Sequence, residues 1–331
     1  MNNKDKQMKK EDLRIVYMGT PDFAVEALRR LVEGGYNVVG VVTMPDKAVG
    51  RHHDTLQASP VKRYAVEHGL PVLQPEKLKN EDFLAELRAL HADLQIVVAF
   101  RMLPEVVWSM PPCGTFNLHA ALLPQYRGAA PINWAIINGE TETGITTFFL
   151  DRDIDTGEVI QQVRVPISDT DDAEAVHDRL MLLGGELVVE TVDRIIAGTI
   201  RPVPQEQMTT DAPLHAAPKI FKDTCRIDWQ GKLLKPLYDF VRGLSPYPAA
   251  WTELVAPDGG AQVLKVYRTE KEFVSHEQET GQVCTDGKTY LKIAVKDGFL
   301  HLCDLQLAGK KRMPVADFLR GSRVDDNYKV R

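Results

Sequence analysis

Residues 13–43 read LRIVYMGTPDFAVEALRRLVEGGYNVVGVVT, and their pattern of apolar residues indicates the class of fold. The apolar run 13–18 predicts a buried strand, and the apolar residues of 23–32 recur at helical spacing. Gly34 and Gly35 are a stop signal for that helix, and the β-branched run 37–43 predicts a second strand. A strand, a helix and a strand in this order form a right-handed crossover between parallel strands.

The same alternation continues along the chain. Further strands are predicted at 71–73, 94–100, 114–118, 144–150 and 158–165, and further helices at 60–68, 80–91, 130–138 and 172–197. Residues 44–59 are expected to form a polar loop. We therefore expect an α/β domain over residues 13–204, with an open, mostly parallel sheet of Rossmann-like topology, after a flexible tail at 1–12.

The pattern changes after residues 201–204, a proline-containing stretch that is typical of a linker. A helix at 233–244 precedes short strands at 250–255, 262–269, 281–284, 290–295 and 299–308. Evenly spaced short strands with Asp-Gly turns between them favour a small OB-like β-barrel over residues 205–331.

Charge is distributed unevenly over these two parts. The 331 residues carry a formal net charge of −6, but residues 1–204 hold 21 basic and 29 acidic residues, whereas residues 205–331 hold 19 and 17. The overall balance argues against a nucleic-acid partner, because phosphate attracts Lys and Arg. The difference in sign, −8 against +2, instead indicates that the two parts meet different partners.

Several classes of protein are disfavoured. No run approaches the roughly 20 apolar residues of a membrane span, and the N-terminal segment lacks the apolar centre of a signal peptide. The four cysteines have no zinc-site spacing, and such sparse cysteine favours a reducing, cytoplasmic compartment. The G-x-G-x-x-G, P-loop and G-x-S-x-G motifs are absent, which disfavours a nicotinamide dehydrogenase, a nucleotide triphosphatase and a serine hydrolase.

Asn117 and His119 end a predicted strand and, two residues apart, point to the same side of the sheet. Ligands of open α/β sheets bind at the carboxyl ends of the strands, where an amide beside an imidazole can stabilise an oxyanion. In isolation this short pattern more often only terminates a strand. Asp155, before a tight Thr-Gly turn, could orient His119, although its acidic neighbours fit a solvated turn. The apolar loop 120–131 suits either a rigid wall for a flat ligand or a buried crossover.

Three motifs in order carry a specific resemblance: NLHAALLPQYRG at 117–128, Gly144-Ile145-Thr146 and Asp155-Thr156-Gly157. The chain resembles the 10-formyltetrahydrofolate-dependent formyltransferases. Further stretches, including RGLSPYPA at 242–249 and GKKRM at 309–313, extend the resemblance from about residue 12 to the end, and to the members that formylate methionine on initiator tRNA. The resemblance implies transfer of the formyl group to the α-amine of that methionine, which supports translation initiation.

The family's catalytic Asn, His and Asp map onto Asn117, His119 and Asp155. The resemblance places the folate co-substrate along Ala121, Leu122, Leu123 and Pro124 and beside Phe100, Met102 and Leu103. It places the tRNA at Arg51, Lys310, Lys311 and Arg312. It implies no metal, no membrane and no obligate protein partner. Ala121 stands where the family usually has Ser, and Phe100-Arg101 where it often has Tyr-Gly.

Three alternatives remain open at this point. A glycinamide ribonucleotide formyltransferase would resemble only residues 13–204, whereas a sugar-amine formyltransferase can carry a similar second domain. A non-catalytic RNA-binding protein, in which the barrel acts alone, is disfavoured by the intact trio Asn117, His119 and Asp155.

Overall fold

A computed structural model describes residues 8–49, 55–208, 210 and 212–331. The chain divides into two compact units that are interleaved in sequence. The first holds the chain up to Gly128 together with 143–165 and 177–216, and the second holds 129–142, 166–176 and 217–331. In the described part of the chain no helix is long and apolar enough to cross a membrane.

The first unit is built on a seven-stranded sheet with the order β10-β9-β7-β6-β1-β2-β5. Its strands are β1 (Ile15–Gly19), β2 (Val38–Val42), β5 (Val72–Leu73), β6 (Leu94–Val98), β7 (Thr115–His119), β9 (Glu142–Phe149) and β10 (Val159–Pro166). The pairs β1–β2, β1–β6, β2–β5 and β6–β7 are parallel, whereas β7 and β9 run antiparallel. The expected open, mostly parallel sheet is confirmed.

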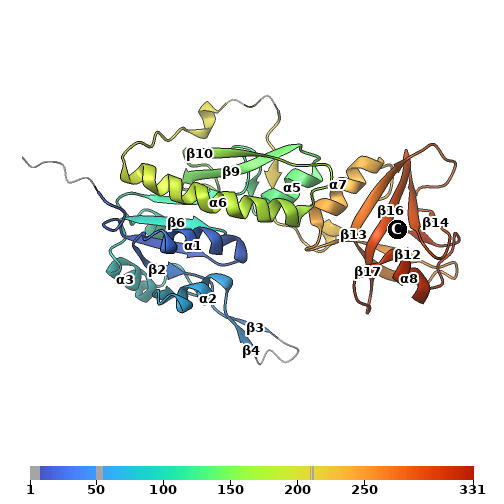
Figure 1. Ribbon diagram of the computed structural model, residues 1–331, viewed down its shortest axis with the longest axis horizontal. Coiled ribbons are helices and arrows are strands. Elements are labelled where there is room, and N and C mark those ends of the chain that lie inside the picture. Colours follow the sequence, from blue (N-terminus) through green and yellow to red (C-terminus); the bar gives the residue numbers. More distant parts are fainter. Residues whose placement is uncertain (1–7, 50–54, 209, 211) are drawn as a thin grey trace, which may run out of the picture. The chain divides into compact units, whose positions relative to one another are not determined.

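The helices of this unit are α1 (Val25–Glu33), α2 (Pro60–Glu67), α3 (Glu81–Ala89), α4 (Glu105–Trp108) and most of α6 (Ala173–Ile196). Two of these helices begin at capping residues. Ser59 caps α2, because its hydroxyl accepts from the Lys62 N–H and Pro60 takes the first helical position, and the Asn80 side chain caps α3. Figure 1 shows α1 and α6 on the same face of the sheet. On α6, Gly184 approaches Leu118 of β7 and Gly185 approaches Arg30 of α1 so closely that side chains there would collide.

Two predicted features of this unit differ from the structure. Residues 44–59 are not entirely loop, because β3 (Lys47–Val49) and β4 (Thr55–Gln57) pair as an antiparallel hairpin. The predicted strand 94–100 ends at Val98, because Ala99 adopts a left-handed backbone with a φ of 47° that breaks the extended strand.

The second unit contains an antiparallel barrel in the strand order β14-β15-β16-β13-β12-β18. Its strands are β12 (Ala250–Val255), β13 (Ala261–Phe273), β14 (Val283–Thr285), β15 (Leu291–Val295), β16 (Gly298–Leu307), β17 (Met313–Pro314) and β18 (Lys329–Val330). The bridge Gln282–Lys329 joins the start of β14 to β18, so the sheet almost closes on itself. The predicted small β-barrel is confirmed.

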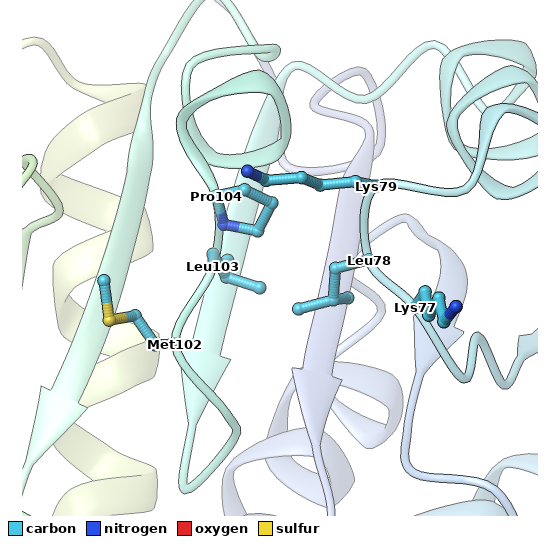
Figure 2. A pocket seen from close by; sticks show the side chains of 6 residues that line it. All are labelled: Lys77, Leu78, Lys79, Met102, Leu103 and Pro104. Carbon is cyan, nitrogen blue, oxygen red and sulfur yellow. The ribbon is translucent and has the colours of Figure 1, made fainter.

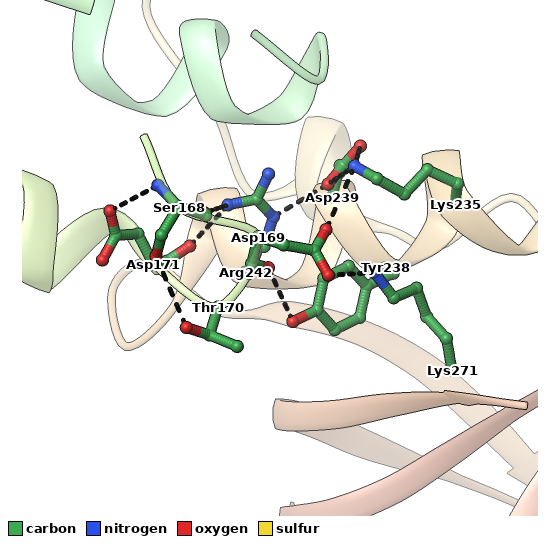
Figure 3. A network of polar contacts seen from close by, with 9 residues as sticks. All are labelled: Ser168, Asp169, Thr170, Asp171, Lys235, Tyr238, Asp239, Arg242 and Lys271. Atoms are coloured by element: carbon green, nitrogen blue, oxygen red, sulfur yellow. Dashed lines mark hydrogen bonds and ion pairs between the residues drawn. The ribbon is translucent and has the colours of Figure 1, made fainter. Parts of the chain in front are cut away.

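Three helices belong to this unit: α5 (Pro131–Ile137), α7 (Leu234–Leu244) and α8 (Val315–Gly321). Apolar residues of α7 pack into the barrel core. Arg242 of α7 is buried, and its Nε donates to Asp239 at 2.8 Å, while its Nη1 donates to the carbonyls of both Ser168 and Asp171 (Figure 3). Residues 168–171 are thereby tied to α7 within the same unit.

Candidate active site at the carboxyl end of β7

β7 carries two of the predicted catalytic side chains. In the ladder Asn117 pairs with Val97 of β6 and Phe148 of β9, and His119 pairs with Thr146 of β9. His119 is 6% exposed, and the Oδ1 atom of Asn117 is buried without a hydrogen-bond partner among the described residues. Buried polar atoms of native proteins are nearly always paired, so this amide is an exception of the kind found at sites that receive a ligand.

The imidazole of His119 is held on both sides. Its Nε2 atom lies 2.8 Å from the carbonyl oxygen of Tyr126, and its Nδ1 atom lies 3.8 Å from Oδ2 of Asp155. Because a carbonyl oxygen only accepts hydrogen bonds, the Nε2 atom carries a proton. The Phe148 ring meets the imidazole edge-on with centroids 6.4 Å apart and fixes its plane.

Asp155 reaches this position through an unusual backbone. Its φ is 57°, a left-handed value that few residues other than glycine adopt, and Asp is among the more tolerant. The Gly128 N–H donates to Asp155 Oδ2 at 2.9 Å, and the carboxylate is only 12% exposed. A Cβ atom on Gly157 would stand 1.7 Å from the carbonyl oxygen of Phe149, so only glycine lets this loop pass so close to β9.

The structure places Asn117 and His119 at the carboxyl end of β7 and the Asp155 carboxylate beside His119. Two backbone groups complete the site and were missed, namely the Tyr126 carbonyl and the Gly128 N–H. No residue type marks a backbone partner, so the sequence holds no direct signal for either. A left-handed Tyr126, with a φ of 57°, turns that carbonyl toward His119.

The predicted folate wall 121–124 is firmly fixed. The Thr146 hydroxyl donates to the Ala121 carbonyl at 2.6 Å and accepts from the Leu123 N–H at 3.2 Å. Gln162 donates to the Leu123 carbonyl at 2.8 Å. The side chains of Ala121, Leu123 and Pro124 are buried, whereas Leu122 is partly exposed. Three side-chain hydrogen bonds therefore hold this loop, which follows His119 in the chain.

Met102 and Leu103, two further predicted folate contacts, line a pocket of about 500 Å³. The pocket walls are Lys77, Leu78, Lys79, Met102, Leu103 and Pro104 (Figure 2). In this view Leu78 and Leu103 point toward each other, and Lys79 extends toward Pro104. Phe100 is not among the lining residues. Arg101 joins the two sides of the pocket, because its guanidinium donates to the carbonyls of Pro75 and Glu76.

The predicted tRNA contacts are only partly described. Arg51 lies outside the described residues. Lys310 and Lys311 are exposed in the turn between β16 and β17. Arg312 instead pairs with Asp304 at 2.6 Å and stacks over the Tyr267 ring at 4.3 Å from its centroid. Of the four predicted tRNA contacts, Lys310 and Lys311 are therefore the two whose side chains are exposed and form no ion pair within the described part of the chain.

Among the described residues no group of three or more His, Cys, Asp or Glu side chains is placed to hold a metal ion. The class of protein to which this fold and these residues belong is given by family models that match both parts of the chain. A model described as "Formyl transferase" matches residues 13–192, and one described as "Formyl transferase, C-terminal domain" matches 219–323. The chain belongs to the formyl transferase family.

Within that family the chain is similar along its whole length to proteins named methionyl-tRNA formyltransferase. It is 71% identical over 324 residues to that of Phocaeicola vulgatus and 67% identical over 323 residues to that of Bacteroides thetaiotaomicron, with 98% of this chain and 100% of each relative covered. The Porphyromonas gingivalis protein is 51% identical over 325 residues. The resemblance inferred from the motifs is confirmed.

Solved structures share the fold at much lower identity. The sugar 3N-formyl transferase WlaRD matches with a TM-score of 0.61 at 19% identity over 90% of this chain and 99% of that one. HypX from Aquifex aeolicus, solved with tetrahydrofolic acid, matches with a TM-score of 0.61 at 18% identity over 93% of this chain. The chain spans about half of HypX, 47% of its length. Both likenesses concern the fold alone.

Proposed function

We propose that the chain transfers the formyl group of 10-formyltetrahydrofolate to the α-amine of methionine esterified to initiator tRNA. The observation that carries the proposal is that Asn117, His119 and Asp155 lie together at the carboxyl end of β7. Relatives named methionyl-tRNA formyltransferase match nearly the whole chain. Residues 13–204 would form the catalytic domain and residues 205–331 the tRNA-binding domain.

In this reaction the amine nitrogen attacks the formyl carbon, and the carbon–N10 bond of the folate breaks. The amine loses one proton and N10 gains one, so formyl-methionyl-tRNA and tetrahydrofolate leave. The amide of Asn117 donates to the oxyanion of the tetrahedral intermediate, which is the largest single contribution that such a site makes. Asp155 supports the transfer of the proton that the amine loses.

His119 would supply positive charge beside that oxyanion. Its Nε2–H is already bonded to the Tyr126 carbonyl at 2.8 Å, and its Nδ1 faces Asp155. In this arrangement a doubly protonated ring would donate to the Tyr126 carbonyl on one side and face the Asp155 carboxylate on the other. His119 therefore acts through its charge, or by sharing the Nε2 proton between Tyr126 and the oxyanion.

The folate co-substrate would lie between the rigid loop 121–124 and the pocket lined by Met102 and Leu103. A fixed wall and an apolar pocket suit a flat ring with an apolar linker. Two ammonium groups at the pocket, those of Lys77 and Lys79, suit the carboxylates of a folate. The site needs no metal ion in this mechanism, because the polarising groups are side chains and backbone.

The tRNA would contact the exposed Lys310 and Lys311 and the segment that carries Arg51. A modest number of phosphate contacts makes binding salt-dependent, because each contact releases counterions. We expect the KM for Met-tRNA to rise with salt while the KM for the folate barely changes. A KM for the acceptor that is independent of salt would argue for a small amine in place of tRNA.

Sugar-amine formylation is the second candidate, because WlaRD shares the fold over most of both chains. The two functions separate in one competition assay. Purified protein with 10-formyltetrahydrofolate is offered initiator Met-tRNA and a dTDP-linked amino sugar at equal concentration. We expect formylation of the tRNA-bound methionine and none of the sugar.

A further inference from the structure

Gln205 is a buried amide close to the catalytic trio that the mechanism above does not use. It follows Pro204 in a short 3-10 turn, η2 (Gln205–Gln207), and is only 2% exposed. Its Nε2 donates to the carbonyls of Asp155 at 2.9 Å and Gly157 at 2.8 Å. Its Oε1 accepts from Nε and a terminal nitrogen of Arg127, at 3.1 and 2.7 Å. Both donors and both acceptor positions of the carboxamide are therefore in use.

These four bonds join two loops that flank His119. One loop carries Arg127, whose neighbour Tyr126 offers its carbonyl to Nε2 of the imidazole. The other carries Asp155, whose carboxylate faces Nδ1. One side chain thus bridges the two loops that hold the imidazole from opposite sides, although it lies 50 residues beyond Asp155 in the chain.

The backbone around Gln205 is itself anchored. Val203 and Val159 exchange both backbone hydrogen bonds, each at 2.9 Å, so this segment is fixed to the start of β10. Only a neutral amide can complete the bridge, because it must donate twice and accept twice. A glutamate carboxylate would face two carbonyl oxygens without a proton to offer, and a methionine of similar length would make none of the four bonds.

We propose that Gln205 is a positioning residue for formyl transfer, which sets the distance between Asp155, His119 and the Tyr126 carbonyl by fixing both loops. This inference rests on the proposed function, because positioning has meaning only for a reaction at this site. A displacement of reacting groups by about 1 Å costs on the order of 100-fold in rate. We therefore expect Gln205→Met to lower kcat about 10- to 100-fold and to leave both KM values within about twofold.

The matched control is Gln207→Met, the same substitution at an exposed position of the same turn. It should retain wild-type kcat. Gln205→Asn, which keeps the amide but is one methylene shorter, tests the same idea with less disturbance if Gln205→Met does not fold. Gln205→Asn should lose activity in the same direction and by a smaller factor.

A double-mutant cycle with Asp155→Asn separates positioning from a general loss of stability. If Gln205 acts through the Asp155 loop, adding Gln205→Met to Asp155→Asn should lower kcat by less than about twofold further, because neighbouring sites couple. In the wild type the Nε2 proton of His119 should be visible by NMR, protected by its bond to Tyr126. In Gln205→Met it should be lost to exchange, and in Gln207→Met it should remain.

Wild-type activity is measured first. An inactive wild type would overturn the proposed function. An active wild type with full kcat in Gln205→Met and Gln205→Asn would overturn the role of Gln205 and leave the function standing. The role of Gln205 would also be overturned if the kcat losses of Gln205→Met and Asp155→Asn multiplied in the double variant while the His119 proton signal stayed unchanged in Gln205→Met.

Discussion

The Nδ1 atom of His119 lies 3.8 Å from Oδ2 of Asp155. The distance exceeds that of a direct hydrogen bond by several tenths of an ångström, so the two groups face each other without a hydrogen bond between them. The Asp155 carboxylate is already bound by the Gly128 N–H, and the imidazole by the Tyr126 carbonyl. Hydrogen bonds of catalytic groups are often long before substrate binds and shorten in the reacting complex.

Asp155→Asn removes the charge and keeps the shape. We expect kcat for formyl transfer to fall about 10²- to 10⁴-fold, the range in which a positioned acid–base group contributes. The affinity for tRNA should change little, because Asp155 faces His119. Steady-state formylation and tRNA titration check this. Asp153→Asn, two residues earlier and exposed, is the control and should stay fully active. Wild-type kcat in Asp155→Asn would remove this residue from the mechanism.

Asn117→Ala separates activity from stability. We expect formyl transfer to fall about 10²- to 10³-fold, as when one oxyanion donor is lost. The unfolding temperature should stay within about 2 °C, because Asn117 Oδ1 has no partner to lose among the described residues. Calorimetry and the formylation assay are run on the same sample. An active variant, or one that loses activity only because it unfolds, contradicts the assigned role.

Gly157→Ala forces a methyl group against the Phe149 carbonyl oxygen, at an ideal distance of 1.7 Å. Backbone cannot move aside as a side chain can, so we expect a loss of about 3 kcal/mol in unfolding free energy and a displaced Asp155. Denaturant unfolding measures the first effect and kcat the second. Gly321→Ala, where a Cβ would meet nothing within 4 Å, should be neutral. Equal behaviour of the two variants would show that the loop can shift freely.

Arg242→Met tests the buried ion pair of the second unit. The Arg242 and Asp239 side chains are 8% and 4% exposed, and Arg242 also satisfies the carbonyls of Ser168 and Asp171 (Figure 3). Removing the guanidinium takes away the donor to two buried carbonyls, while Lys235 still pairs with Asp239 at 2.6 Å, so we expect a loss of about 3 kcal/mol in unfolding free energy. Arg268→Met, in an exposed pair with Glu270, should cost less than about 1 kcal/mol. Similar losses in both variants would contradict this account.

Glu272 makes the barrel's stability depend on acid pH. The ammonium of Lys292, and after it the imidazole of His301, hold the pKa of Glu272 below its ordinary value of 4.5. As pH falls through 4.5, the unfolded chain takes up this proton before the folded one does. Stability is therefore fully present above that value and falls as pH drops toward the folded pKa.

Glu272→Gln should therefore flatten the fall in unfolding free energy below pH 4.5, measured by urea unfolding at several pH values. Glu277→Gln, exposed and nearby, should keep the wild-type slope. A slope in Glu272→Gln that equals the wild-type slope would show that the folded carboxyl titrates as it does in the unfolded chain.

Periodicity made much of the fold predictable. The crossover at 13–43 and the helix at 172–197 reappear as β1-α1-β2 and α6, because buried strands and amphipathic helices need those apolar spacings. The hairpin of β3 and β4 was missed because its strands, Lys-Ala-Val and Thr-Leu-Gln, have three residues each and are too short for a periodic signal. Helix α8 was also missed, because seven residues carry too little periodic signal.

The side chains of the site were predictable in part. The spacing of Asn117 and His119 placed them on one side of a strand, and the family motif added Asp155. The Tyr126 carbonyl and the Gly128 N–H are backbone groups, which no residue type announces. Gln205 gains its role only when folding brings position 205 against Arg127 and Asp155, so its contribution depends on contacts that are distant in sequence.

The proposed function is tested by the formylation of initiator Met-tRNA by the wild-type chain. Purified protein is mixed with 10-formyltetrahydrofolate and charged initiator tRNA, and formyl-methionyl-tRNA and tetrahydrofolate are both quantified. We predict that the two products appear in equal amounts, and that Asp155→Asn under the same conditions forms them at least about 100-fold more slowly. No formyl-methionyl-tRNA with the wild-type protein in excess over tRNA would contradict the account.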